Sequence, residues 1–301
     1  DYTRVFTNMM SDQYDTQYRE SMWEVEFLGD RSSASSWSNG RIGDVMGLQS
    51  TPASNFGEMN CNYSYGMYNG SLKLWDLYWT EDRTEAEDKL PTVTDRRQNW
   101  NMSPYNYAGN NNWPPYGTPG LSGTGKSVNG MDKTPYVYNN SSTTMDPLTA
   151  AGIRNAGKWR RETQYEGHMV AKSLYTCVNF PLLRYSDVLL MFAEASNELE
   201  GPTSDAYQAV KDVRDRAGIA TRALADYDQA SFRSLVRNER GRELCLEALR
   251  KYDLIRWGDF VRVMNDYPKW TSDERWSKSS SLANAAASIG RNVQPKHILF
   301  P

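Results

Sequence analysis

The chain has 301 residues, with 34 Lys and Arg against 37 Asp and Glu, so its formal net charge is -3. This balance argues against a dedicated nucleic-acid binder, because such proteins present a basic surface to the phosphates. The mean hydropathy is -0.73, and the lack of an apolar run near ~18 residues excludes a membrane-spanning helix.

The first predicted element is a strand close to the N-terminus. From residue 22 to residue 27 the side chains alternate, with Trp23, Val25 and Phe27 on one face and acidic residues on the other. Strict alternation is typical of a half-buried strand. The Ser-, Gly- and Asn-rich stretch that follows, residues 29–40, is predicted to be a surface loop.

Two later segments combine aromatic and amide side chains. Residues 60–82 contain six Tyr or Trp, and the part from Ser71 to Glu81 has the pattern of a short helix. Residues 99–140 contain 9 Asn, 6 Gly and 5 Pro together with seven Tyr or Trp. Long segments without regular structure are usually binding loops or disordered, and so many aromatic residues argue against disorder. We therefore expect ordered binding loops.

The second half of the chain is predicted to be helical. A helix is expected from Tyr185 to Glu200, with Ser186 as its N-cap and the Gly201-Pro202 pair at its end. A second helix starts after Thr203 or Ser204 and stops at Gly218. The pair has the length of a tetratricopeptide (TPR) unit, so the region is called TPR-like. The apolar residues on one face of the first helix are Val188, Phe192, Ala195 and Leu199.

A third helix is expected from its N-cap, Asp228, to about Glu247. Asp253 is expected to cap a short helix after it. The apolar surface of the third helix would consist of Phe232, Leu235, Val236, Leu244 and Leu246.

Five sequence blocks, which are listed below in chain order, resemble the SusD/RagB family. This family consists of outer-membrane nutrient-binding lipoproteins of Bacteroidetes. The longest is similar to the family signature NFPxxRYADVLLxxAEA. One departure is Ala248, which stands where the family usually has the glycine of FEGxR, and it weakens the expectation of a sharp bend there. The blocks are Asp95–Arg97, Asn179–Ala195, Val213–Gly218, Glu239–Leu244 with Glu247, and Arg250 with Asp253–Trp257.

The resemblance implies a mainly α fold, in which a TPR-like helical scaffold carries a loop-rich, aromatic insertion with short β-strands. We expect residues 1–165 to form the loop-rich glycan-binding region and residues 166–301 the helical core. Both would belong to one SusD-like fold, and this chain would be the C-terminal portion of a longer protein whose N-terminal TPR-like part is absent.

The resemblance also implies a function at the cell surface, without catalysis or a cofactor. Members capture an oligosaccharide or polysaccharide and deliver it to a SusC-like TonB-dependent transporter in the outer membrane. The full-length protein would be held there by a lipid anchor that this chain lacks. Capture of a peptide-derived nutrient stays open, as does the identity of any glycan.

A sugar ring has an apolar C–H face and a rim of hydroxyl groups, so it needs flat aromatic surfaces beside amide groups. Both kinds of side chain are abundant between residues 60 and 116. Packing in the core is the alternative role of each aromatic residue, and some of these loops could instead face the transporter. The candidates are Tyr63, Tyr65, Trp75, Trp79 and Trp113 for ring stacking, and Asn60, Asn62, Asn111 and Asn112 for hydroxyl groups.

Two other classes of function compete with glycan capture. Glu239, Glu243 and Glu247 recur every four residues, and paired carboxylates are the acid and base of glycoside hydrolases. Because arginines surround them, we favour ion pairs that fix helix packing. The second competitor is a protein-interaction scaffold that binds no glycan.

A metal site is not expected, since the chain has two separate histidines and no Cys/His cluster. The three cysteines are expected to be free, buried thiols. A calcium site in the acidic loop is not favoured, because the loop lacks the DxDxDG pattern. Its carboxylates would come from Asp82, Glu85, Glu87 and Asp88.

Overall fold

The computed structural model describes residues 2–10, 13–27, 40–48, 65–78, 95–103, 155–160, 176, 178–271 and 287–298. Within these ranges most regular structure is helical, which confirms the predicted fold class. None of the described helices is both long and apolar enough to span a bilayer.

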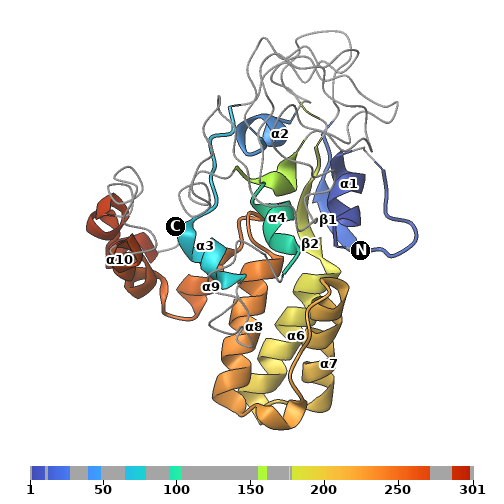
Figure 1. Cartoon of the computed structure of the whole chain (residues 1–301), viewed down its shortest axis with the longest axis vertical. Coiled ribbons are helices and arrows are strands. Elements are labelled where there is room, and N and C mark those ends of the chain that lie inside the picture. Colours follow the sequence, from blue (N-terminus) through green and yellow to red (C-terminus); the bar gives the residue numbers. More distant parts are fainter. Residues whose placement is uncertain are drawn as a thin grey trace, which may run out of the picture.

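The helices α6 (Tyr185–Glu200), α7 (Ser204–Arg216) and α8 (Gln229–Glu243) form a bundle at one end of the molecule (Figure 1). Helix α6 packs against both α7 and α8. The short 3-10 helix η4 (Leu224–Asp226) lies in the connection from α7 to α8. Burial of apolar side chains between the three helices stabilises the bundle. This core contains Leu190, Ala193, Ala206, Val210, Val213, Phe232, Leu235 and Val236.

Local hydrogen bonds explain where these helices begin. The Thr203 hydroxyl accepts from the backbone N–H of Ala206, and Asp228 forms a capping box with Ser231. Both predicted starts are therefore confirmed. The prediction for Ser186 is wrong: Arg184 occupies the N-cap position of α6, and Ser186 lies in the first turn with its side chain buried.

The face of α6 that the apolar pattern marks does not lie in the bundle core. Phe192 is 48% exposed and Leu199 is 80% exposed, and Ala195 is also exposed. The buried face instead carries Leu190, Ala193 and the polar Asn197. The sequence therefore predicts the helix correctly, but the face of α6 that is buried is the face that packs against α7 and α8.

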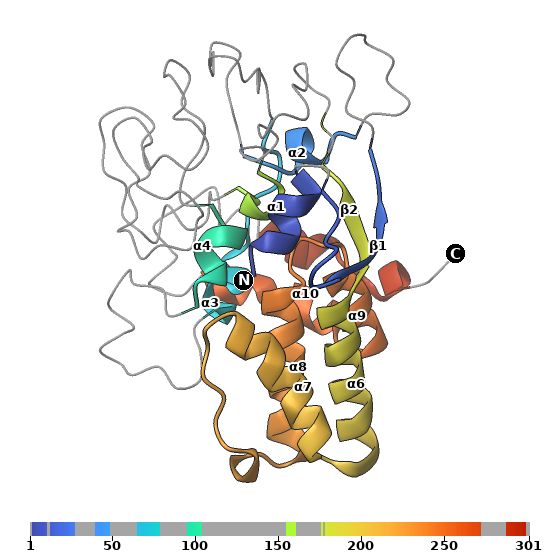
Figure 2. The ribbon, with the colours of Figure 1, turned by 90° about the vertical axis from the view of Figure 1, so that its right-hand side faces the viewer.

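The strand β1 (Ser21–Val25) pairs antiparallel with β2 (Phe180–Arg184), which runs directly into α6 (Figure 2). The predicted strand is confirmed, but its half-buried face is not, because Trp23 is 66% exposed and Val25 is 38% exposed. The register shifts on both sides of Trp23, and such irregularity disturbs the alternation of faces.

A second core joins the two halves of the sequence. Helix α1 (Arg4–Met10) and the 3-10 helix η2 (Gly157–Trp159) are in contact, and η2 also contacts α4 (Arg97–Asn101). Helix α2 (Ile42–Val45) lies beside this group. The buried side chains of this core are Tyr2, Val5, Phe6, Met9, Met10, Trp100, Ala156, Trp159 and Val178.

Three helices gather at one side of α8: α3 (Leu72–Leu77), α9 (Arg250–Arg256) and α10 (Phe260–Thr271). The short helix expected near Ser71 is confirmed, with Ser71 as its N-cap. The prediction that Asp253 caps a helix is wrong, because Asp253 lies inside α9 and is ion-paired with Arg240. The 3-10 helix η5 (Pro295–Ile298) follows near the C-terminus.

Candidate functional site

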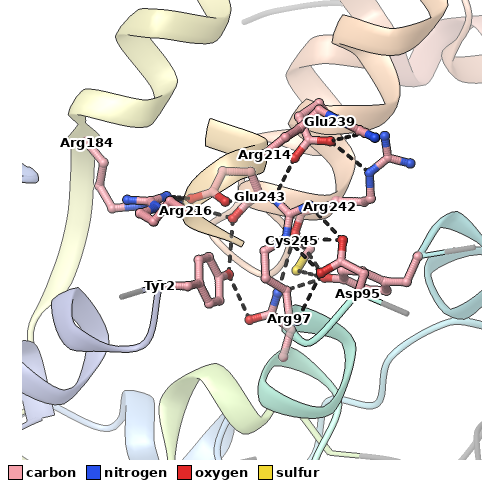
Figure 3. A network of polar contacts seen from close by, with 12 residues as sticks. Tyr2, Asp95, Arg97, Arg184, Arg214, Arg216, Glu239, Arg242, Glu243 and Cys245 are labelled. Carbon is pink, nitrogen blue, oxygen red and sulfur yellow. Dashed lines mark hydrogen bonds and ion pairs between the residues drawn. The ribbon is translucent and has the colours of Figure 1, made fainter. Parts of the chain in front are cut away.

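The most prominent polar feature is a buried group of charges that we call the central ion cluster. Its carboxylates are Glu239 and Glu243 on α8, which Figure 3 labels, and Glu247, which follows the helix. Successive carboxylates are four residues apart, which brings Glu239 and Glu243 to the same side of α8. The cationic members come from both halves of the sequence and are Arg97, Lys158, Arg184, Arg214, Arg216 and Arg242.

Arg97 is the link between the loop-rich half and α8. Its Nη1 lies 2.5 Å from Glu239 Oε1 and 2.9 Å from Glu243 Oε2, and its Nη2 lies 2.7 Å from Asp95 Oδ2. All four side chains are fully buried. Bidentate contact of this kind is what the planar guanidinium group provides and an ammonium group does not.

Arg184 makes the corresponding link from the end of β2. Its Nε lies 2.8 Å from Glu247 Oε2, and its Nη1 lies 2.7 Å from Glu20 and 3.1 Å from Glu243. Lys158 adds a second cation to Glu247 at 2.6 Å. It also donates to the backbone carbonyls of Glu243 and Cys245, so it fixes the chain as it leaves α8.

The surrounding cations keep these carboxyl groups ionised. Burial by itself would raise the pKa of Glu239, but Arg97, Arg242 and Arg214 lower it to about 2. Burial likewise opposes a fall in the pKa of Glu243, which Arg216, Arg184 and Arg97 hold far below its usual range. Arg184 and Lys158 lower the pKa of Glu247 against the same opposing effect of burial.

A glycoside hydrolase needs a carboxylic acid that is protonated near neutral pH and can reach the substrate. Glu239, Glu243 and Glu247 meet neither condition, because they are ionised, buried and already paired. The structural interpretation of these glutamates is therefore confirmed.

A chain of hydrogen bonds adjoins the ion cluster. The Tyr2 hydroxyl donates to Asn101 Oδ1 at 2.9 Å, and Asn101 Nδ2 donates to the Tyr78 hydroxyl at 2.7 Å. Tyr78 in turn donates to the Arg242 carbonyl and lies 3.1 Å from Cys245 Sγ. Cys245 is a free, buried thiol, as expected, and burial raises its pKa.

Of the nine predicted ligand-binding residues, Tyr65 and Trp75 lie in the described part of the chain. Tyr65 is 41% exposed. Its backbone N–H donates to the Asp44 carbonyl at 3.0 Å, and the Arg41 guanidinium lies 5.9 Å from its ring centroid. The ring is thus held at the surface by α2 and its flank, and its assignment to ligand binding stays a prediction.

Trp75 occupies a different environment. It is 4% exposed and packs with Tyr78, Met102 and Cys245. A ring covered in this way has no face for a sugar, so the packing role applies to Trp75. Seven predicted residues lie outside the described ranges: Asn60, Asn62, Tyr63, Trp79, Asn111, Asn112 and Trp113.

Tyr68 was not among the predicted ligand-binding residues, although it is 52% exposed and lies three residues beyond Tyr65. Its carbonyl accepts from the Ala156 N–H. Nearby, Asn155 Nδ2 donates to Asn69 Oδ1 and to the Gly66 carbonyl, at 2.9 Å each. We call residues 65–70 the tyrosine segment. Long-range anchoring by Asn155 leaves no local signal in the sequence, which explains the omission.

No group of three or more His, Cys, Asp or Glu that could hold a metal ion occurs among the residues that the structure describes. The acidic loop weighed as a calcium site, with Asp82, Glu85, Glu87 and Asp88, lies outside them.

The sequence pattern of the SusD family matches residues 19–296. SusD-like protein P25 of Formosa agariphila is 38% identical over 125 residues, which are 40% of this chain and 20% of the relative. A crystallised SusD homolog from Bacteroides thetaiotaomicron aligns with a TM-score of 0.72 at 23% identity, over 100% of this chain and 52% of its own. This chain thus spans about half the length of that relative.

A second protein of known structure from Bacteroides thetaiotaomicron, surface glycan-binding protein A, aligns with a TM-score of 0.50 at 20% identity. The alignment covers 98% of this chain and 54% of that protein. Likeness at this level of identity shows the fold.

Proposed function

Because the chain belongs to the SusD family, we propose that it is part of a glycan-binding protein that captures an oligosaccharide and does not cleave it. The observation that carries the proposal is the pair of exposed tyrosines, Tyr65 and Tyr68, on a segment held in place by α2 and by Asn155. Exposed rings on a fixed backbone can stack on the apolar face of a sugar at little entropic cost.

Binding without turnover is supported by the state of the helical carboxylates. A carboxylate that two or three buried cations already hold has no proton to donate and no access to a ligand. These carboxylates therefore serve to hold the helices together. Trp79 and Trp113 are proposed to extend the stacking surface, with amide groups of Asn60, Asn62, Asn111 and Asn112 bonded to hydroxyl groups.

The name of one structural relative, a surface glycan-binding protein, supports the same class of ligand. We further propose that the full-length protein is held by a lipid anchor at the outer membrane and passes its ligand to a SusC-like TonB-dependent transporter. Co-purification of that transporter with the full-length protein, and loss of the complex on deletion of the loops, would test the transfer step.

Affinity electrophoresis in gels that contain a polysaccharide tests the capture step. Tyr65→Ala and Tyr68→Ala are each expected to weaken retention about fivefold, because stacking on one ring contributes roughly 1 kcal/mol. Tyr252→Ala is the matched control, since Tyr252 is a 54% exposed tyrosine on α9. If both segment variants migrate like the wild type while the polysaccharide retards the wild type, the ligand binds elsewhere.

A further inference from the structure

A cavity of 530 Å³ is lined by residues of α3, α8, α9 and α10, and Asn69 and Gly70 at the end of the tyrosine segment also line it. Its size falls within the range of ordinary small-molecule sites, ~300–1,000 Å³. Part of its wall is apolar and comes from Leu77, Leu254 and Val263, on three different helices. The cavity plays no part in the proposed function.

The described charged side chains of the cavity wall are mostly cationic. Among the described residues that line it, Lys73, Arg237, Arg250 and Arg262 are cationic and Asp259 is a carboxylate. Asp259 is already engaged, because Arg262 donates to it from Nε at 3.0 Å and from Nη2 at 2.7 Å. Arg237 Nη1 lies 3.3 Å from the same carboxylate. Among the described residues of the wall, cationic side chains therefore outnumber carboxylates.

Arg250 carries most of this excess. Its Nη1 donates to the Arg237 carbonyl at 2.9 Å, and among the described residues no carboxylate lies within 4 Å of its guanidinium nitrogens. The Trp257 ring holds one side of the group, because the Cζ atom of Arg250 lies 5.2 Å from the ring centroid.

The pKa values of two cationic groups in the wall, Lys73 and Arg250, are lowered by their surroundings. Burial and then the charges of Arg250 and Arg262 lower the pKa of Lys73. The pKa of Arg250 is lowered as well, mainly by burial. The nearby Asp253 raises this pKa, whereas the charges of Arg240, Arg237 and Arg242 lower it further. Cations that repel one another at a half-buried surface are stabilised when an anion enters.

We propose that this cavity binds the carboxylate of an organic acid that has a ring with an apolar face. Arg250 and Lys73 would hold the carboxylate, since a guanidinium fork fits two carboxylate oxygens. The leucine and valine side chains would contact the ring. A uronic acid unit of an acidic saccharide and a free aromatic acid offer the same chemistry, and the experiment below distinguishes them.

Benzoate is the probe, and benzamide is its uncharged isostere. Titration of the whole chain by NMR or calorimetry is expected to show binding of benzoate and not of benzamide. Arg250→Gln and Lys73→Gln are each expected to weaken benzoate about tenfold, the effect of one charge-assisted hydrogen bond. Arg233→Gln is the control, because it removes one positive charge from α8, which also lines the cavity, at a position that does not line it.

A variant that fills the cavity provides a second test, in case the charge variants lose binding because they do not fold. Ser234 is an exposed residue that lines the cavity, so Ser234→Trp should block benzoate while all four cations remain. Equal binding of benzoate and benzamide, or benzoate binding that Arg250→Gln and Ser234→Trp leave unchanged, would overturn the assignment. Neutral glycans bound at the tyrosine segment would then still uphold the proposed function.

The source of the acid is decided by competition. Trigalacturonate that displaces benzoate, while its methyl ester does not, would identify the acid as a saccharide. Benzoate that binds without such competition would identify a free organic acid as the ligand.

Discussion

Arg97 and Glu239 are 142 residues apart in the sequence, and their side chains form a 2.5 Å ion pair at which both are completely buried. The pair joins α4 in the loop-rich half to α8 in the helical half. Two further pairs, Lys158–Glu247 and Arg184–Glu20, also join the described parts of the two halves.

Loss of Arg97 is expected to destabilise the protein severely. Arg97→Met leaves three buried carboxylates, on Asp95, Glu239 and Glu243, without a shared partner, and breaking a buried ion pair costs about 3–5 kcal/mol. Urea unfolding monitored by circular dichroism measures the loss. Arg233→Met, which breaks an exposed pair with Glu198, is the control and should unfold like the wild type. A wild-type midpoint for Arg97→Met would mean that the pair contributes nothing.

Acid is expected to unfold the protein by protonating the ion cluster. The pKa of Glu239 is about 2 in the folded chain, and those of Glu243 and Glu247 are also lowered. The unfolded chain, with glutamate pKa values of about 4.3, binds protons more readily. The stabilisation is therefore complete above ~pH 5 and is lost as the pH falls toward ~2.

Urea unfolding at pH 7, 5, 4 and 3 tests this dependence. Glu239→Gln is the control and should be less stable at pH 7, with a shallower fall toward acid. A free energy of unfolding that stays constant from pH 6 to pH 3 would contradict the ionised state of the cluster.

Replacing Ala248 by glycine is expected to stabilise the protein. Ala248 has φ of 64°, in the left-handed region, where an alanine costs roughly 1–2 kcal/mol. Glycine removes this strain. It also raises the conformational entropy of the unfolded chain, which offsets part of the gain, so the free energy of unfolding is expected to rise by about 0.5–1 kcal/mol. The sharp bend that the sequence left in doubt is thus present despite the alanine.

The matched control for this change is Ala195→Gly, at an exposed position in the middle of α6, which should lose about 1 kcal/mol. Thermal unfolding of both variants gives the comparison. A lower melting temperature for Ala248→Gly would show that the left-handed conformation carries no strain.

The sequence predicted the elements whose signals are local. The capping residues Thr203 and Asp228 marked the starts of α7 and α8, and the four-residue spacing of the glutamates among arginines indicated ion pairs. The strand β2 was missed, because its pairing with β1 depends on a partner more than 150 residues away.

What could not be predicted is which side of an element is covered. Phe192 and Leu199 have the spacing of a core face, but α7 and α8 pack on the opposite side of α6. Trp75 and Tyr65 belong to the same aromatic stretch, residues 60–82, yet the Trp75 ring is buried against Tyr78 and the Tyr65 ring is exposed. Composition identifies residues that are able to bind a sugar, and only tertiary packing decides which of them can be reached.

The most direct test of passive capture is to incubate the protein with a panel of oligosaccharides, recover the bound fraction and measure its mass. We expect at least one oligosaccharide to be retained and then released at the mass with which it was loaded. Shorter products in the bound or free fraction, abolished by Glu239→Gln, would contradict the account.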